Sequence, residues 1–552
     1  MTRLRTADAT MGSVMTPLGL RTFAGACLVS CCTLALLLAT SPWLSMVWDE
    51  GDTIIRAAAV ERRAGFEPAL DANDRLSDSE APPLTSDDDI WPYTTTREGH
   101  PPLAGILIAE GMQVAPAWFD PLTAARFGPM ALFAVAAGAM FYRLQRDYQV
   151  LAVSLMAVAS LVLMPRVFAH AHYATLDGPL TACWVLAWAA FAPACRQWRW
   201  IPWFGLALGL TLCSKFSGWL APLPFIAWTV LYRDRGGLRA LAVGVPLAVL
   251  VFVLLNPPLW HQPLSGLGTF FDLNLHRGAR PELNISTQFF GRMYNLDHPL
   301  PFYNTLVWTA ITISPLLMIM GFAGIVGAVK RWRTDRAGAL LVCQWCTLII
   351  VRALPWAPPH DAERLILPSF AFFAALIGVG FGRGLYRETL LKREKIVAQG
   401  WTKVAIAIAL VAGLLDSIGY FPHGLSFYSR LIGGVRGATA LGMEPTYYWD
   451  ALDRPALDWL REHTTGDEKV AFAAAPKRNL ELLKRWGLLS RLPSDPGTFR
   501  WYVIQRRPSA LQAVDHWLIE HEEPDFERTL SGVPLLDVYS YDKYARALAA
   551  TH

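Results

Sequence analysis

Residues 22–52 read TFAGACLVSCCTLALLLATSPWLSMVWDEGD, an apolar run that ends on three carboxylates, Asp49, Glu50 and Asp52. The run 22–47 is long enough to cross the roughly 30 Å hydrocarbon core of a bilayer as a helix. Ionisable side chains are costly at the edge of that core, so acids placed there favour a functional site. The alternative is that these acids only mark the helix end and face water.

Apolar runs of this kind recur along the chain. The 552 residues are 53% hydrophobic and 17% charged, with a mean hydropathy of +0.30, and soluble proteins carry about 25% charged residues. This composition predicts a multi-spanning α-helical membrane protein and disfavours a soluble enzyme or a fibre. About eleven runs are candidates for membrane-spanning helices: 22–47, 124–142, 149–165, 178–195, 201–214, 217–232, 239–256, 304–329, 337–354, 366–383 and 402–420.

The charges predict both a partner class and an orientation. A net charge of +4, from 49 Lys and Arg against 45 Asp and Glu, is too balanced for a nucleic-acid-binding protein. Most Lys and Arg of the short loops fall on one side of the predicted helices, among them Arg143, Arg196, Arg233 and Arg336. The positive-inside rule makes that side cytoplasmic. We therefore expect an integral protein of a bacterial-type inner membrane.

This orientation divides the chain into three parts. Residues 1–21 form a cytoplasmic N-terminus, and 22–420 form the transmembrane part, whose first extracytoplasmic loop is 48–123. An acidic stretch within that loop, 71–89, is typical of a solvated surface excursion. The tail 421–552 is predicted to be a small extracytoplasmic α/β domain. Its expected helices are 455–463 and 479–486, and its expected strands are 470–474, 501–505 and 535–541.

Metal chemistry is not expected. The eight cysteines lie in or at the ends of apolar stretches and lack paired zinc-ligand spacing, so neither a disulfide framework nor a Cys-ligated metal site is predicted. His170 and His172 are spaced as in some metal sites, but positions i and i+2 do not share a helical face. We therefore predict neither a metal nor a cofactor.

The first loop returns to the membrane through His100-Pro101-Pro102-Leu103. The two prolines fix the backbone and hold the imidazole just before an apolar helical stretch. A histidine can donate to a phosphate or move a proton. The alternative is an ordinary loop histidine at a helix start that the prolines define.

Other polar residues fall at helix ends on the same predicted membrane face. They are Asp177, Lys215, His360 and Arg364. Each alone could cap a helix, and Lys215 could be a salt-bridged anchor at the interface. A set that converges on one face predicts a site.

These motifs resemble those of a known family. Asp49-Glu50 followed by His100-Pro101-Pro102-Leu103 resembles the first outer loop of protein O-mannosyltransferases and their relatives. These are membrane glycosyltransferases of the GT-C fold, glycosyltransferase family 39, which also includes the lipid A aminoarabinose transferase. Further matches follow in the same order: Leu176-Asp177-Gly178-Pro179-Leu180, Ser214-Lys215-Phe216-Ser217-Gly218, Asn256-Pro-Pro-Leu-Trp260-His261, and His360 with Arg364-Leu-Ile-Leu-Pro368.

The resemblance covers about residues 20–420, with two departures. The acidic stretch 71–89 lengthens the first loop, and nothing resembles the β-trefoil domain of the eukaryotic protein O-mannosyltransferases. The tail, with Thr446-Tyr447-Tyr448-Trp449-Asp450, is similar to the tails of less characterised bacterial members.

The resemblance implies an activity and its partners. The family's donors are sugars on polyprenyl or dolichyl phosphate, and the acceptor here would be a glycolipid, a glycan or a protein, in contact with membrane lipid. By the resemblance Asp49 is the base of an inverting transfer, and Glu50 orients the acceptor or a neighbouring cation. The residues expected at the leaving phosphate are His100, Lys215, Arg364 and His360. Asp177 would orient a cation, and relatives are generally metal-independent.

Two other functions fit part of the pattern. A transporter or flippase of lipid-linked sugars also needs many helices with polar groups, but transporters place ionisable residues near the bilayer midplane in related halves. The polar groups here gather at one face, and we find no internal repeat, which favours the transferase. A non-catalytic scaffold is disfavoured because Asp49, His100, Lys215 and Arg364 are all present.

Overall fold

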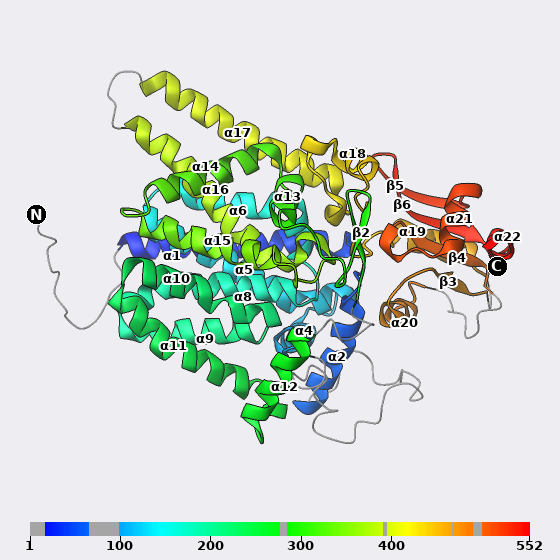
Figure 1. Cartoon of the computed structure of the whole chain (residues 1–552), viewed down its shortest axis with the longest axis horizontal. Helices are drawn as coiled ribbons and strands as arrows, with labels where there is room; N and C mark the ends of the chain where they lie inside the picture. Colours follow the sequence, from blue (N-terminus) through cyan, green and yellow to red (C-terminus); the bar gives the residue numbers. More distant parts are fainter. Residues whose placement is uncertain are drawn as a thin grey trace, which may run out of the picture.

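Helices make up most of the structure and form a bundle, with the C-terminal part of the chain at one end (Figure 1). The predicted acidic excursion 71–89 and most of the predicted segment 1–21 lie outside the described residues. The computed structural model describes residues 17–65, 99–276, 284–389, 395–465, 468–489 and 499–551.

Every apolar run predicted from the sequence coincides with one or two helices of the bundle. The run 304–329 is divided in two, because Ser314 leaves the helical region and Pro315 starts a new helix without an N–H to donate. The bundle consists of α1 (Pro17–Thr40), α5 (Pro121–Tyr148), α6 (Leu151–Val162), α8 (Asp177–Arg196), α9 (Ile201–Leu212), α10 (Pro222–Tyr232), α11 (Arg235–Leu254), α13 (Asn304–Ile311), α14 (Pro315–Lys330), α15 (Arg336–Arg352), α16 (Leu367–Thr389) and α17 (Lys395–Tyr420).

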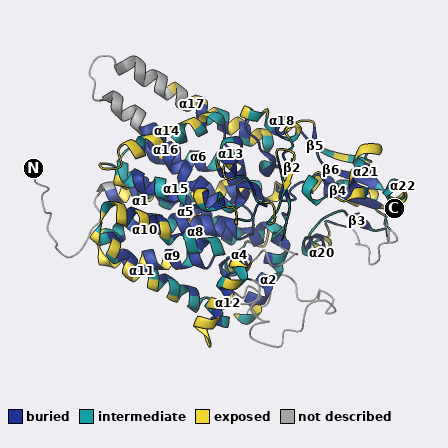
Figure 2. Cartoon of the chain, viewed as in Figure 1, coloured by how far each residue is buried: buried dark blue, intermediate teal, exposed yellow. Residues whose placement is uncertain are grey.

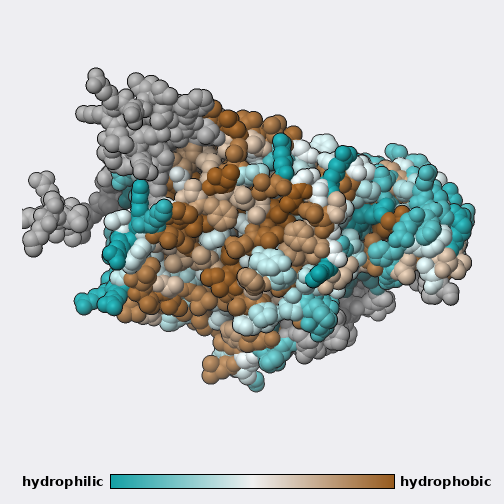
Figure 3. All heavy atoms as spheres, turned by 45° about the horizontal axis from the view of Figure 1, so that its top comes forward, coloured by the Kyte–Doolittle hydropathy of each residue, from teal (hydrophilic) through white to brown (hydrophobic). Residues whose placement is uncertain are grey.

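Within the described chain, five helices are long and apolar enough to cross a membrane: Gly19–Trp43, Pro121–Tyr148, Asp177–Arg196, Arg235–Leu254 and Ala362–Gly382. Shorter apolar helices, such as α6 and α14, pack beside them. The outer surface of the bundle carries a broad apolar zone between more polar ends (Figure 3). The chain is therefore an integral membrane protein, as predicted, and a total of eleven crossings stays a prediction.

The centre of the bundle is α16, which packs against α6, α8, α14 and α15. The side chains of its residues 367–382 are almost all buried, in contrast to the exposed outer faces of the surrounding helices (Figure 2). Gly324 of α14 lets the two backbones approach closely, since a Cβ there would lie 2.0 Å from the carbonyl oxygen of Leu376. Small residues serve membrane helix packing in this way.

The loops predicted to be cytoplasmic lie together at the end of the bundle away from the C-terminal part (Figure 1). Tyr148 donates to Asp335 at 3.2 Å, and Arg336 pairs with Asp234 at 3.3 Å. These contacts join the end of α5 to the starts of α15 and α11. The side of the membrane on which these loops lie stays a prediction.

Three short helices and a hairpin were not expected from the sequence, because they are shorter or more polar than the runs that the hydropathy pattern detects. These elements are α2 (Glu50–Arg63), α7 (Pro165–His170), α12 (Pro263–Leu275), β1 (Thr287–Phe289) and β2 (Arg292–Tyr294). A further short helix, α4 (Leu103–Val114), is the apolar helical stretch predicted to follow His100.

The last part of the chain contains a four-stranded sheet in the order β3-β4-β6-β5. The two helices and three strands expected there from the sequence are present, whereas α18, α21, β5 and α22 were not expected. The elements are α18 (Gly434–Ala440), α19 (Arg454–His463), β3 (Val470–Phe472), α20 (Lys477–Arg485), β4 (Trp501–Gln505), α21 (Ala513–His521), β5 (Phe526–Leu530), β6 (Val533–Ser540) and α22 (Tyr541–Thr551).

The sheet is mixed. β3 and β4 are parallel, joined by a crossover that contains α20, and the other pairs are antiparallel. β5 and β6 meet through a two-residue turn, Ser531-Gly532, in which both residues have positive φ. That backbone matches the twist of an antiparallel hairpin.

The C-terminal part packs directly on the chain that follows α1. Asn479 of α20 accepts from the Gly51 N–H at 2.9 Å and donates to the Val47 carbonyl at 2.8 Å. The Trp48 N–H donates to the Tyr448 carbonyl at 3.2 Å. One hydrophobic core continues from α2 and α4 into β4 and β6. These contacts hold the C-terminal part over the polar end of the bundle. A cavity lies between the two parts.

Candidate active site

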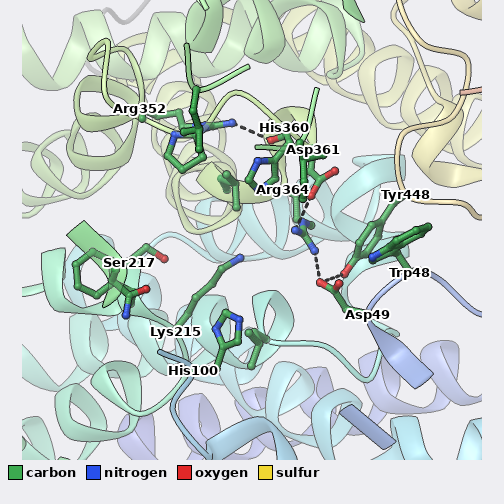
Figure 4. A pocket seen from close by; sticks show the side chains of 18 of the residues that line it. Trp48, Asp49, His100, Lys215, Ser217, Arg352, His360, Asp361, Arg364 and Tyr448 are labelled. Atoms are coloured by element: carbon green, nitrogen blue, oxygen red, sulfur yellow. Dashed lines mark hydrogen bonds and ion pairs between the residues drawn. The ribbon is translucent and has the colours of Figure 1, made fainter. Parts of the chain in front are cut away.

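A cavity of about 1050 Å³ lies between the end of the bundle and the C-terminal part. Five of the seven site residues predicted from the sequence line it (Figure 4). They are Asp49, His100, Lys215, His360 and Arg364. Asp177 lies behind Lys215, and Glu50 lies elsewhere. The structure thus gathers residues that are more than 300 positions apart in the sequence.

Asp49 stands at the start of α2, directly before its first turn. Its Oδ2 accepts from Arg364 Nη1 at 2.5 Å and from the Tyr448 hydroxyl at 2.6 Å, and the side chain is 36% exposed. Enclosure in the cavity wall acts to raise the pKa of Asp49, but Arg364 and Tyr448 outweigh it, so the pKa lies below its ordinary value. Asp49 is therefore an ionised carboxylate that opens on to the cavity.

Arg364 connects several acids. Besides Asp49, its Nη2 donates to Asp361 at 2.6 Å, and its Nη1 lies 3.7 Å from Asp177. The guanidinium also lies over the ring of Tyr448, 4.3 Å from its centroid. Its Nε is buried and has no hydrogen-bond partner in the described structure. Arg364 thus orients Asp49, and its Nε is a nitrogen that remains available to another acceptor.

Lys215 and Asp177 form a second charged pair in the same wall. Lys215 lies on an extended residue between α9 and the short turn Phe216–Leu220, and Asp177 is the first residue of α8. The Lys215 ammonium donates to Asp177 Oδ1 at 2.6 Å and is 14% exposed. Burial lowers the pKa of Lys215, although Asp177 opposes this shift. In Figure 4 the ammonium points toward Arg364.

The His100 turn is held beside Lys215. Gly99 has a φ of +71°, and its carbonyl accepts from Asn274 at 3.1 Å. The Leu103 N–H donates to the Cys213 carbonyl at 3.1 Å, two residues before Lys215. A Cβ at position 99 would lie 2.7 Å from the Asn274 side chain, so glycine is needed both for the φ and for the space.

His360 lies on the opposite segment, before α16. Its Nε2 lies 4.0 Å from Asp361 Oδ2, and its carbonyl accepts from Arg352 Nη2 at 2.9 Å. His360 thus borders the cavity beside the acid that holds Arg364.

Glu50 differs from its neighbour Asp49. It is fully buried and does not line the cavity. Its two oxygens accept from Arg126 Nε and Nη2, both at 2.7 Å, and from the N–H groups of Val47 and Ala174. Glu50 therefore holds a neighbouring cation, but it does not reach the cavity to orient an acceptor. Its assignment as a catalytic residue is corrected to that of a positioning residue.

Several cavity residues were not identified from the sequence. Tyr448 reaches Asp49 across 399 positions, so no local pattern indicated that contact. Asp361 directly follows His360 and could have been found from the density of ionisable residues there. Asp361 and Trp449 have positive φ values of 60° and 59°. Such backbone strain gathers at functional sites.

The C-terminal part supplies the remaining wall. Trp449 packs on Trp48 with ring centroids 3.9 Å apart, and Arg507 lies over Trp449, 4.2 Å from its centroid. Arg507 Nη1 also lies 3.4 Å from Asp361 Oδ1. Among the described residues, no group of three or more His, Cys, Asp or Glu side chains is arranged to hold a metal ion.

Comparison with known proteins gives one sequence match and several structural likenesses. Residues 99–261 match the family described as dolichyl-phosphate-mannose-protein mannosyltransferase, so the resemblance inferred from the motifs is confirmed over that range. The matched range includes His100, Asp177 and Lys215, but not Asp49 or Arg364. No curated protein matches the chain in sequence.

Two similar solved structures cover most of the chain. One is ArnT from Cupriavidus metallidurans bound to undecaprenyl phosphate, at 12% identity, covering 95% of this chain and 98% of that one, with a TM-score of 0.48. The other is the archaeal oligosaccharyltransferase AglB from Archaeoglobus fulgidus in complex with an inhibitory peptide and a dolichol-phosphate. It is 13% identical, and the likeness covers 89% of this chain and 69% of that one, with a TM-score of 0.48.

Proposed function

We propose that this protein is a membrane glycosyltransferase that moves a sugar from a polyprenyl or dolichyl phosphate to an acceptor hydroxyl. The observation that carries the proposal is the cavity in which an ionised Asp49 and the cations Lys215 and Arg364 share one wall region. The family match over residues 99–261 supports the same reaction class.

The chemistry needs a base, and Asp49 suits that role. The acceptor oxygen attacks the anomeric carbon, its proton passes to Asp49, and the bond from that carbon to the phosphate oxygen breaks. The phosphate leaves with the electron pair. Attack from the side opposite the phosphate inverts the anomeric centre. The Tyr448 hydroxyl donates a hydrogen bond to Asp49 Oδ2 in this structure. An acceptor hydroxyl therefore either displaces the Tyr448 hydroxyl from Oδ2 or donates to Oδ1.

The leaving phosphate needs positive charge and hydrogen-bond donors. Lys215 gives one of its three N–H bonds to Asp177, which leaves the ammonium able to donate into the cavity. We assign His100 and the Arg364 Nε to the same group, with His360 at its border. Asp177 keeps Lys215 in place and takes no direct part.

The lipid chain of the donor needs an apolar path. Leu220, Leu348, Val351 and Leu365 line the cavity together with the charged residues. We place this end of the bundle on the extracytoplasmic side of a bacterial-type inner membrane, because the loops at the other end carry the excess of Lys and Arg. The acceptor is then a glycolipid, a glycan or a protein on that side.

The test is sugar transfer by the purified full-length protein in lipid, with a panel of radiolabelled polyprenyl-phosphate sugars. We expect wild type to turn over one donor, Asp49→Asn and Lys215→Ala to lose that turnover, and Asp272→Asn to keep it. Asp272 is the matched control, since it is an exposed acid on α12 that does not line the cavity.

The same proteins test the alternative function. If no donor is turned over but labelled lipid crosses the bilayer equally in wild type, Asp49→Asn and Lys215→Ala, the protein is a transporter or flippase. The roles assigned to the site residues would then be wrong together with the mechanism.

A further inference from the structure

Arg352 is a buried cation at the cavity to which the mechanism assigns no role. It is the last residue of α15, is 8% exposed and lines the cavity. Its Nη2 donates to the His360 carbonyl at 2.9 Å. Its Nε and Nη1 are buried and have no hydrogen-bond partner within the described structure. Buried donors without a partner call for a specific explanation, such as an ion or a ligand.

Arg352 also has no ion pair among the described residues, although the charge of Asp361 acts on it from a longer distance. The other buried cations of the cavity each have a carboxylate: Lys215 has Asp177, Arg507 has Asp361, and Arg364 has both Asp49 and Asp361. In the described part of the chain, no carboxylate oxygen lies within 4.0 Å of Arg352. Water could satisfy its N–H groups, but it would bring no counter-charge.

The surroundings of Arg352 indicate the kind of anion. Leu348 and Val351 precede it, Trp356 follows it, and all three line the cavity. An anion bound here therefore lies against hydrocarbon. Nε and Nη1 lie on different edges of the guanidinium, so each can donate one charge-assisted hydrogen bond to a phosphate oxygen. Figure 4 shows Arg352 and Asp49 on different sides of the cavity, so an anion at Arg352 does not compete for the base.

We propose that Arg352 binds the phosphate of a lipid-linked phosphate, as a binding residue additional to Lys215 and Arg364. The proposal rests on the proposed function only in taking a lipid phosphate as substrate. Two sources share this chemistry, the polyprenyl phosphate carrier and a phosphorylated lipid acceptor.

The experiment measures binding to the purified full-length protein in lipid nanodiscs, without sugar transfer. The probes are polyprenyl phosphate, unphosphorylated polyprenol and phosphatidic acid. We compare wild type with Arg352→Gln, Arg352→Lys and the control Arg292→Gln, an exposed arginine of β2. The glutamine keeps a donor for the His360 carbonyl while it removes the charge.

We expect Arg352→Gln to weaken polyprenyl phosphate binding at least tenfold and to leave polyprenol binding unchanged. Arg352→Lys should weaken polyprenyl phosphate binding less than Arg352→Gln does, because lysine keeps the charge but loses the separate Nε and Nη1 donors. Arg292→Gln should match wild type. A loss confined to polyprenyl phosphate identifies the carrier, and a loss confined to phosphatidic acid identifies a phosphorylated acceptor.

Unchanged binding of both phosphates by Arg352→Gln would overturn the proposal. So would an equal loss of polyprenol, since that shows a damaged cavity rather than a missing phosphate contact. The proposed function fails separately, when Asp49→Asn retains sugar transfer, so the two failures are distinguishable.

Discussion

Asp49 and Glu50 are neighbours in the sequence, and each binds an arginine, yet their surroundings differ. The Glu50–Arg126 pair is completely buried, and protein groups satisfy it on every side. The Asp49–Arg364 pair opens on to the cavity, with the carboxylate 36% exposed and its other partner, Tyr448, coming from the C-terminal part. A carboxylate that can exchange partners can act on a substrate, whereas one sealed in a network fixes the backbone beside it.

The largest effect should come from Asp49→Asn. The amide cannot accept the acceptor proton, and general bases contribute about 10²–10⁴-fold to rate. We expect turnover to fall by that factor while the melting temperature changes little, since Arg364 keeps Asp361. The measurement is single-turnover sugar transfer beside thermal unfolding of the same preparation. Turnover within about threefold of wild type would show that Asp49 is not the base.

Glu50→Gln should show the opposite pattern. Removing one charge of a buried pair leaves the other uncompensated and costs about 3–5 kcal/mol. We expect a lower free energy of unfolding, measured by denaturant titration in detergent. The folded fraction, counted by active-site titration, should retain substantial turnover.

A second variant separates charge from packing at this pair. Glu50→Leu with Arg126→Met removes both charges, and we expect it to recover only part of the lost stability, because Arg126 also donates to the carbonyls of Ser41, Leu44 and Ser45. A Glu50→Gln protein as stable as wild type would contradict the structural role.

Tyr448→Phe tests the link between Asp49 and the C-terminal part. Tyr448 helps to hold the pKa of Asp49 below its ordinary 3.8, so its loss raises that pKa. The acidic limb of kcat/KM against pH should therefore move to higher pH. Tyr303→Phe, an exposed tyrosine, is the control.

The lowered pKa of Asp49 also makes the stability of the protein depend on pH. Because the folded state depresses the pKa of Asp49, the pair stabilises the protein above pH 3.8, and that contribution is lost as the pH falls through the folded pKa. Tyr448→Phe should make this contribution smaller and complete its loss at higher pH, because the folded pKa then lies closer to 3.8. An unmoved acidic limb would show that Tyr448 does not act through Asp49.

The sequence predicted the helices and most of the site, for physical reasons that also explain what it missed. Long apolar runs have only one stable form in a bilayer, so hydropathy was enough to find every bundle helix. Lys215 and Arg364 were recognisable because they fall, with other polar residues, at helix ends on one predicted membrane face. The difference between Asp49 and Glu50 was not predictable, since it depends on Arg126 and Tyr448, which are distant in the sequence.

Asn479→Ala should have the smallest effect, and it acts on both acids at once. The Asn479 amide bonds the backbone at Val47 and Gly51, on either side of Asp49 and Glu50. Its loss leaves the Gly51 N–H without this partner, whereas the Val47 carbonyl keeps the Glu50 N–H, and we expect about 1–3 kcal/mol of lost stability. Turnover should fall several-fold, because Asp49 is then less well oriented. Lys484→Ala, an exposed residue of the same helix, should change neither quantity. If stability falls and the turnover of the folded fraction does not, α20 supports the fold of this segment without orienting the base.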